Sequence, residues 1–277
     1  MAIEYRNDQT VRFVVTVIIS IAAALWLFPF VWNIVASLKT PSEITADVWG
    51  LPSGFHWANY ERAFRGLNYT RTLSNSLFVA TSAALLQCVT GTLAGFAFAR
   101  IEFPGRDLVF GLCVATLMIP TTLTITANFI ILQSLGWIDT YLALIIPQAA
   151  SGFSIFLLRQ FFATIPIELE HAARIDGAGR GRFLVRIVAP LSKPALTTVF
   201  VFIFIVNYNE FLWPLIMTRS AEIRVIQIAM SRFTDELGTV DYGPLLAAAI
   251  MVLLPTIILF MVLQQAFVRG ITRTGIK

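Results

Sequence analysis

Six long apolar runs dominate this sequence and restrict what it can fold into. They cover approximately residues 13–38, 73–99, 108–133, 140–163, 195–217 and 243–268. A helix needs about 20 mostly apolar residues to cross the hydrocarbon core of a bilayer, and each run reaches that length. Only 13% of the 277 residues are charged, against about 25% in soluble domains. The sequence therefore predicts an all-α polytopic membrane protein with six transmembrane helices.

The runs also divide the chain into regions. The first run is longer than the apolar region of a cleaved signal peptide, so we expect a retained signal-anchor. The predicted organisation is an N-terminal segment 1–12, a membrane domain 13–268 and a C-terminal tail 269–277. Within the second run, Gly91 and Gly95 form a GxxxG pattern, which predicts close packing of that helix against a neighbour.

The distribution of Lys and Arg predicts the orientation in the membrane. With six spans both termini lie on one side, and that side would hold Arg6, Arg12, Arg100, Arg106, Arg159, Arg174, Arg180, Arg182, Arg186, Lys193, Arg269, Arg273 and Lys277. The opposite side would hold Lys39, Arg62, Arg65, Arg71, Arg219, Arg224 and Arg232. Because cytoplasmic loops carry the excess of positive charge, we expect both termini to be cytoplasmic.

Several classes of site have no support in the sequence. Cys88 and Cys113 lie inside apolar runs, where a free cysteine behaves as a small hydrophobe. His56 and His171 are far apart and have no nearby partner of metal-binding spacing. The basic residues are scattered between apolar blocks, which argues against nucleic-acid binding. We therefore expect no metal site, no catalytic residue and no nucleic-acid partner.

A polar segment, residues 164–194, interrupts the apolar pattern between the fourth and fifth runs. Thr164 offers a capping hydroxyl and Pro166 suits a first helical turn, so a helix is predicted from residue 167 to 176. Gly177 can adopt the left-handed conformation that ends a helix. A second short helix is predicted from 180 to 189, with Pro190 ending it.

The first predicted helix has a face that is small at its centre. Leu169, Ala172, Ala173 and Asp176 follow helical spacing, so another protein could approach this face closely. The alternative is a helix that rests on lipid headgroups, with its arginines near the phosphates. The segment lacks the Trp, Phe and Leu stripe of such helices, which favours docking to a protein.

The stretches "LEHAARIDGA" and "RIVAPLSKP" resemble the EAA loop of the membrane subunits of ATP-binding-cassette importers. In that family a glutamate precedes two alanines; here the alanines are present and His171 stands at the glutamate position, directly after Glu170. The candidate residues for coupling to an ATPase are Glu170, His171, Ala172, Ala173, Asp176, Gly177, Ala178, Ile187 and Pro190.

Further stretches extend the resemblance over the whole chain. "SLKTPSEI", "WANYERAF", "FARIEFPGRD", "NEFLWPLI" and "FVRGITRTGIK" are similar to the carbohydrate-uptake subclass, and in particular to the second permease of the maltose transporter. The resemblance implies a type I importer fold with a cytoplasmic coupling helix, in a prokaryotic inner membrane. It implies as partners a second permease chain, two copies of an ATPase, an external solute-binding protein and a sugar.

The resemblance also assigns the ATP chemistry to another chain. No GxxxxGK[ST] pattern occurs in the sequence, so the loop that cradles phosphates is absent. We therefore expect this chain not to be an enzyme and to bind no cofactor, with ATP and Mg²⁺ held by the partner ATPase. The external segments 39–72 and 218–242 are candidate docking surfaces for the binding protein, with His56, Trp57, Tyr60 and Tyr69.

Glu210 is the one acid placed firmly within a predicted span, beside Asn207, Tyr208 and Asn209. A carboxylate inside the membrane costs a few kcal/mol and usually faces a cavity or a partner. These four residues are the candidates for lining the pore, and the alternative is a structural hydrogen bond to a neighbouring helix. The sequence identifies no particular sugar, and it leaves open whether this chain touches the solute.

Other functions compete with a sugar importer. The same type of transporter could carry another solute, such as glycerol phosphate. A proton-coupled secondary carrier could use Glu210 as a relay, but we find no internal repeat of the kind such carriers contain. A membrane enzyme would need paired carboxylates, a metal cluster or a Ser–His arrangement, and the sequence predicts none of these.

Overall fold

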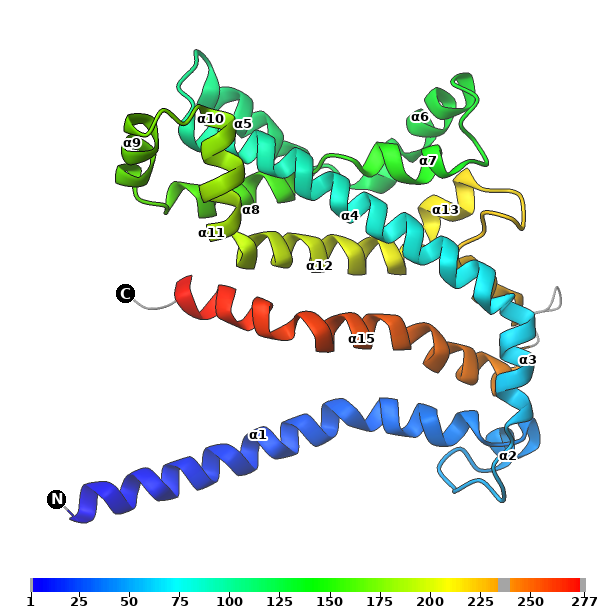
Figure 1. The fold of residues 1–277 in the computed structure, drawn as a ribbon. Helices are drawn as coiled ribbons and strands as arrows, with labels where there is room; N and C mark the ends of the chain where they lie inside the picture. Colours follow the sequence, from blue (N-terminus) through cyan, green and yellow to red (C-terminus); the bar gives the residue numbers. More distant parts are fainter. Residues whose placement is uncertain (1, 234–239, 275–277) are drawn as a thin grey trace. The chain divides into compact units, whose positions relative to one another are not determined.

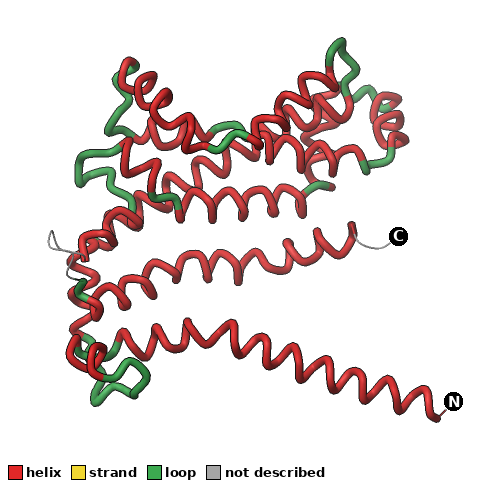
Figure 2. The backbone as a smooth tube through the Cα atoms, turned by 180° about the vertical axis from the view of Figure 1, so that it is seen from behind, coloured by secondary structure: helices red, strands yellow, loops and turns green. Residues whose placement is uncertain are grey.

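The structure, a computed structural model, describes residues 2–233 and 240–274 (Figures 1 and 2). The described residues form helices joined by short connections and contain no strand element, which confirms the predicted fold class. The elements are α1 (Ala2–Ser37), α2 (Pro41–Ala46), α3 (Ala58–Leu67), α4 (Tyr69–Arg100), α5 (Arg106–Ala115), η1 (Thr116–Met118), α6 (Thr121–Ser134), α7 (Tyr141–Ile145), η2 (Ile146–Gln148), α8 (Gly152–Ala163), α9 (Ile167–Ile175), α10 (Arg180–Phe183), η3 (Leu184–Val188), α11 (Ala189–Leu191), α12 (Lys193–Asn209), α13 (Leu212–Met217), α14 (Ile226–Met230), η4 (Ser231–Phe233) and α15 (Tyr242–Thr274).

The chain divides into two compact units. One contains the chain up to Leu67 together with Met230–Leu253, and the other contains Asn68–Ala229 and the chain from Leu254 onward. Parts of three predicted regions lie outside the described residues: Met1 of the N-terminal segment, 234–239 of the external segment 218–242, and 275–277 of the tail.

Three helices are long and apolar enough to cross a membrane, and three bent helix pairs have the same property when each pair is taken as one span. The single helices contain Gln9–Ser37, Tyr69–Arg100 and Tyr242–Gln264. The pairs are Arg106–Met118 with Thr121–Ser134, Tyr141–Gln148 with Gly152–Ala163, and Arg180–Leu191 with Lys193–Asn209. The bends are 100°, 40° and 78° respectively.

Three predicted runs differ from the structure. Run 108–133 is broken between Met118 and Thr121, and run 140–163 between Gln148 and Gly152. The fifth run is broken as well. A continuous helix over 195–217 is wrong, because α12 ends at Asn209 and α13 begins at Leu212. Glu210 has an extended backbone with φ −67° and ψ 128°, so it cannot continue the helix. Its side chain starts the next helix instead: Oε1 accepts hydrogen bonds from the backbone N–H groups of Leu212 and Trp213, at 3.0 and 3.2 Å.

The core of the second unit forms where α4 packs against α8 and α12 (Figure 1). The two glycines of the GxxxG pattern face α8. A Cβ added to Gly91 would lie 3.0 Å from the Cβ of Ser154, and one added to Gly95 would lie 3.0 Å from the backbone N of Arg159. The predicted packing role of these glycines is confirmed, since only hydrogen at these positions lets α4 and α8 approach so closely.

Candidate functional site

Helix α9 begins directly after Pro166, as the polar loop predicts, but not through the predicted cap. Pro166 is the N-cap residue and makes no side-chain capping bond. The hydroxyl of Thr164 instead donates to the carbonyl oxygen of Phe161, at 2.7 Å, within the last turn of α8. The predicted capping role of Thr164 is therefore wrong, because a threonine hydroxyl also finds an acceptor in its own preceding turn.

The C-terminal end of α9 has the predicted glycine stop. Gly177 adopts φ +74°, and its N–H donates to the carbonyl of Arg174 while that of Ala178 donates to Ala173, at 3.0 and 2.8 Å. These two bonds make a Schellman motif, which satisfies carbonyls that the helix itself leaves free. The last turn of α9 is thus well ordered up to the C-cap, Asp176.

The face that α9 exposes is not the face that the sequence predicts. His171, Ala172 and Ile175 are exposed, and Ile175 retains 85% of its accessible surface. Ala173 is 4% exposed and therefore packs into the fold, so it does not share the outer face with Ala172. A partner that approaches α9 would meet these three residues together with the exposed charged side chains of Glu168 and Asp176.

Glu170 lies on the inward face and is 4% exposed. Its Oε1 accepts a hydrogen bond of 2.6 Å from Nη2 of Arg174, one helical turn later. Its Oε2 lies 3.9 Å from Nη1 of Arg100, the last residue of α4. The carboxylate is thus bound within the chain, and its neighbour His171 is the residue available at the outer surface.

The chain after Gly177 continues through three short elements, α10, η3 and α11, of which η3 is a π-helix. Phe183 is 2% exposed and its ring lies 6.2 Å from that of Phe96 on α4. The prediction that Pro190 ends this helix is wrong: the helical backbone runs without interruption from α10 through η3 and α11, and the break follows at Ser192. Ile187 is half-buried, and Arg182 and Arg186 are exposed.

The predicted pore residues gather at the break between α12 and α13. Asn207 and Asn209 donate their side-chain N–H to the carbonyls of Ile203 and Ile205, each at 2.9 Å. Tyr208 is 2% exposed and its ring stacks on Phe204 at 5.7 Å, so its side chain packs inside the chain. Asn209 is exposed and Asn207 and Glu210 are half-buried, so these three are better placed than Tyr208 to meet a solute.

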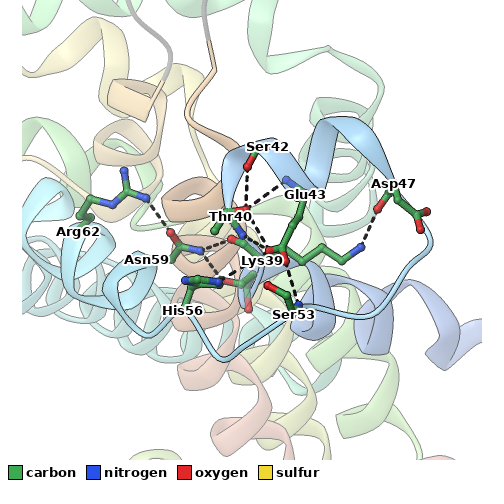
Figure 3. A network of polar contacts seen from close by, with 10 residues as sticks. Lys39, Thr40, Ser42, Glu43, Asp47, Ser53, His56, Asn59 and Arg62 are labelled. Carbon is green, nitrogen blue, oxygen red and sulfur yellow. Dashed lines mark hydrogen bonds and ion pairs between the residues drawn. The ribbon is translucent and has the colours of Figure 1, made fainter.

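The residues that follow the first span form a fixed polar network in the first unit (Figure 3). Lys39 is 1% exposed, and its ammonium donates to the carbonyls of Asp47 and Val48 at 2.9 and 3.2 Å. Asn59 of α3 donates to the carbonyls of Ser37 and Lys39, both at 2.8 Å. These bonds hold the loop 47–57 against the ends of α1 and α3.

Helix α2 in the same network begins with a capping box. Thr40 accepts the backbone N–H of Glu43 and Glu43 accepts that of Thr40. Hydrogen bonds from Ser53 and from the Thr40 backbone lower the pKa of Glu43 to about 2. Glu43 is therefore ionised at every physiological pH.

Among the predicted docking residues, Trp57 is 64% exposed, whereas His56 and Tyr60 are half-buried. Tyr69, also half-buried, lies in the other unit.

The comparison with known protein families identifies this chain. The family described as "Binding-protein-dependent transport system inner membrane component" matches residues 90–273, which include α9 and the break at Glu210. The chain belongs to this family. It is thus an inner-membrane transport component, and its family is that of transporter permease subunits.

Relatives of this permease match almost its full length. The sn-glycerol-3-phosphate transport system permease protein UgpE of Agrobacterium fabrum is 34% identical, over 97% of this chain and 98% of its own. The UgpE protein of Rhizobium meliloti is 35% identical, over 90% of this chain and 91% of its own. A solved bacterial ABC transporter involved in the import of the acidic polysaccharide alginate contains a chain of the same fold, with a TM-score of 0.81, 23% identity and coverage of 95% and 98%.

The sequence did not predict that Arg100, at the end of α4, contacts Glu170 of the polar loop. Arg100 lies 70 positions before Glu170, and no local pattern links the two. The available signal was a single arginine at the end of a predicted span, which the expected charge distribution already explains. Within the described part of the permease, no three His, Cys, Asp or Glu side chains cluster in a way that could hold a metal ion.

Proposed function

We propose that this permease forms half of the translocation pore of an ATP-driven, binding-protein-dependent importer, and that α9 is its docking element for a cytoplasmic ATPase. The observation that carries the proposal is the geometry of α9. The helix is closed by a Schellman motif, is anchored inward through Glu170 and presents His171, Ala172 and Ile175 outward. A short, rigid helix with a small exposed face suits insertion into a groove of a partner protein.

The assembly that we propose contains a second permease chain, two copies of the ATPase and an external solute-binding protein. ATP and Mg²⁺ would bind to the ATPase, and this chain would bind no cofactor. Both termini and the loop 164–194 would be cytoplasmic. The segments 39–72 and 218–242 would then be external, and the network around Lys39 would give the binding protein a fixed surface.

The solute that we propose is a sugar or an oligosaccharide. Asn207, Asn209 and Glu210 supply amide and carboxylate groups of the kind that hydrogen-bond sugar hydroxyls. The alternative is sn-glycerol 3-phosphate, which the names of the UgpE relatives favour. Glycerol 3-phosphate carries two hydroxyl groups and an anionic phosphate, which the Glu210 carboxylate would repel, so these side chains suit an uncharged sugar better.

A first experiment tests the proposed function without knowledge of the solute. The chain, tagged and purified from its native membrane in mild detergent, is expected to bring with it an ATPase whose hydrolysis vanadate inhibits. The measurement is ATP hydrolysis in the purified fraction, with an unrelated six-span protein of the same host as the control. A folded, monodisperse preparation without vanadate-sensitive hydrolysis would contradict docking of an ATPase on α9.

A second prediction concerns the charge of Glu210. Glu210→Gln keeps a side-chain oxygen that can accept the N–H groups of Leu212 and Trp213, so α13 should still be capped. We expect thermal stability to be unchanged and uptake to fall, because a pore carboxylate loses its charge. Glu210→Ala, which also removes the cap, should cost about 1 kcal/mol of stability. Normal uptake kinetics in Glu210→Gln would restrict Glu210 to the capping role.

A further inference from the structure

Three elements meet at the guanidinium of Arg100. The residue ends α4, and its Nη2 donates to the carbonyl oxygen of Phe162 in the last turn of α8, at 2.6 Å. The same nitrogen donates to the carbonyl of Ile165, in the link between α8 and α9. Nη1 lies 3.9 Å from Oε2 of Glu170 on α9. One side chain therefore joins the ends of α4, α8 and α9.

These contacts are buried in the fold. The side chains of Arg100 and Glu170 are each 6% exposed. The last carbonyls of a helix have no partner within the helix, so a buried end needs a donor such as this guanidinium. Removing one member of a buried ion pair leaves an uncompensated charge, which is strongly destabilising. The arrangement is therefore specific for an arginine facing a carboxylate.

Arg100 and Glu170 are held in different ways. Arg100 is hydrogen-bonded to the carbonyls of Phe162 and Ile165, so it is fixed to α8. At 3.9 Å the Glu170 carboxylate is attracted by charge without a hydrogen bond to Arg100. The attraction between charges falls only gradually with distance, so α9 stays attached to Arg100 when it is moved. Arg174, which bonds the other oxygen of Glu170, belongs to α9 itself.

We infer that Arg100 is a positioning residue that transmits movement of α9 to the membrane helices α4 and α8. This inference rests on the proposed function, because it requires that an ATPase moves α9. The outward residues of α9 do not contact Arg100, and Arg174 still holds Glu170 when Arg100 is lost. Docking of the ATPase and transmission of its movement are therefore separable properties of this loop.

The test measures a distance in the complete transporter with its bound ATPase. Spin labels are placed at Ile167→Cys, at the start of α9 and outside the three outward docking residues, and at Leu93→Cys on α4, both exposed positions, after replacing Cys88 and Cys113 by serine. The interlabel distance is compared without nucleotide and after trapping with MgATP and vanadate. In the parent protein the distance distribution is expected to be the same in both states, because α9 and α4 move together.

The Arg100→Gln, Glu170→Gln double variant removes both buried charges at once, so neither is left unpaired. We expect it to retain the ATPase and to show a shifted or broadened distance distribution after trapping. Arg100→Lys keeps the charge but loses the forked donors, and should give an intermediate broadening. Arg106→Gln is the matched control: Arg106 begins α5 and pairs with its neighbour Asp107, and the variant should behave as the parent.

Two results would overturn the inference. A double variant with the same distance distributions as the parent would show that Arg100 transmits nothing. Loss of the ATPase from the double variant, with the parent retaining it, would show that the pair builds the docking surface. Absence of the ATPase from the parent protein as well would instead contradict the proposed function.

Discussion

Replacing Gly177 with proline is expected to abolish binding of the ATPase, and with it uptake, while the chain still inserts into the membrane. Proline fixes φ near −65°, whereas Gly177 adopts φ +74°. The substitution also removes the N–H that donates to the carbonyl of Arg174. The last turn of α9 would lose its Schellman motif, and the chain beyond it could not turn toward α10. The measurement is vanadate-sensitive ATP hydrolysis in the purified fraction.

The chain offers a matched control two residues later. Gly179 adopts φ −71°, which proline can adopt, and a Cβ at either glycine would meet no atom within 4 Å. Gly179→Pro should therefore retain hydrolysis. Gly177→Ala isolates the conformational cost, since a left-handed alanine loses about 1–2 kcal/mol and should weaken docking only in part. Full ATPase binding by Gly177→Pro would remove α9 as the docking element.

Gly177 could be predicted from the sequence because its role depends on neighbours in the chain. A glycine after a helical pattern requires only local backbone geometry, and the same holds for the spans and the GxxxG pattern. The inward turn of Glu170 could not be predicted in this way, because it depends on Arg100, 70 positions earlier. The sequence placed Glu170 and His171 together as candidates, and only the packing of α9 separates them.

The break in the fifth span shows a second limit of local reasoning. Apolar composition predicts one helix over 195–217, since hydropathy does not register where a helix is interrupted. On that basis Glu210 is an isolated carboxylate within a span, which predicts a pore residue. In the structure the same carboxylate caps α13, so its position in the sequence has a structural cause as well. A carboxylate in an apolar run can line a pore or cap a helix, and the hydrogen bonds of Glu210 show the capping role.

Replacing Gly95 with leucine is expected to prevent the membrane core from forming. A Cβ at this position would lie 3.0 Å from the backbone N of Arg159 and 3.2 Å from the Cβ of Leu158. Backbone atoms cannot move aside as a flexible side chain can, so α4 and α8 would have to separate. The expected result is a chain that aggregates or is degraded, seen as loss of the monodisperse peak in detergent.

Gly95→Ala and Gly111→Leu make this prediction specific. The alanine variant should fold, with an overpacking cost of about 1–3 kcal/mol and a melting temperature lower by roughly 2–10 °C. Gly111 lies in α5, and a Cβ added there would have no atom of this chain within 4 Å. Its leucine variant should therefore remain folded. A monodisperse, thermally unchanged Gly95→Leu protein would mean that α4 and α8 do not pack through this glycine. The contact between α4 and α8 at the GxxxG pattern would then contribute nothing to stability. Arg100 could not transmit movement of α9 into the core, because α4 and α8 would not form a rigid pair.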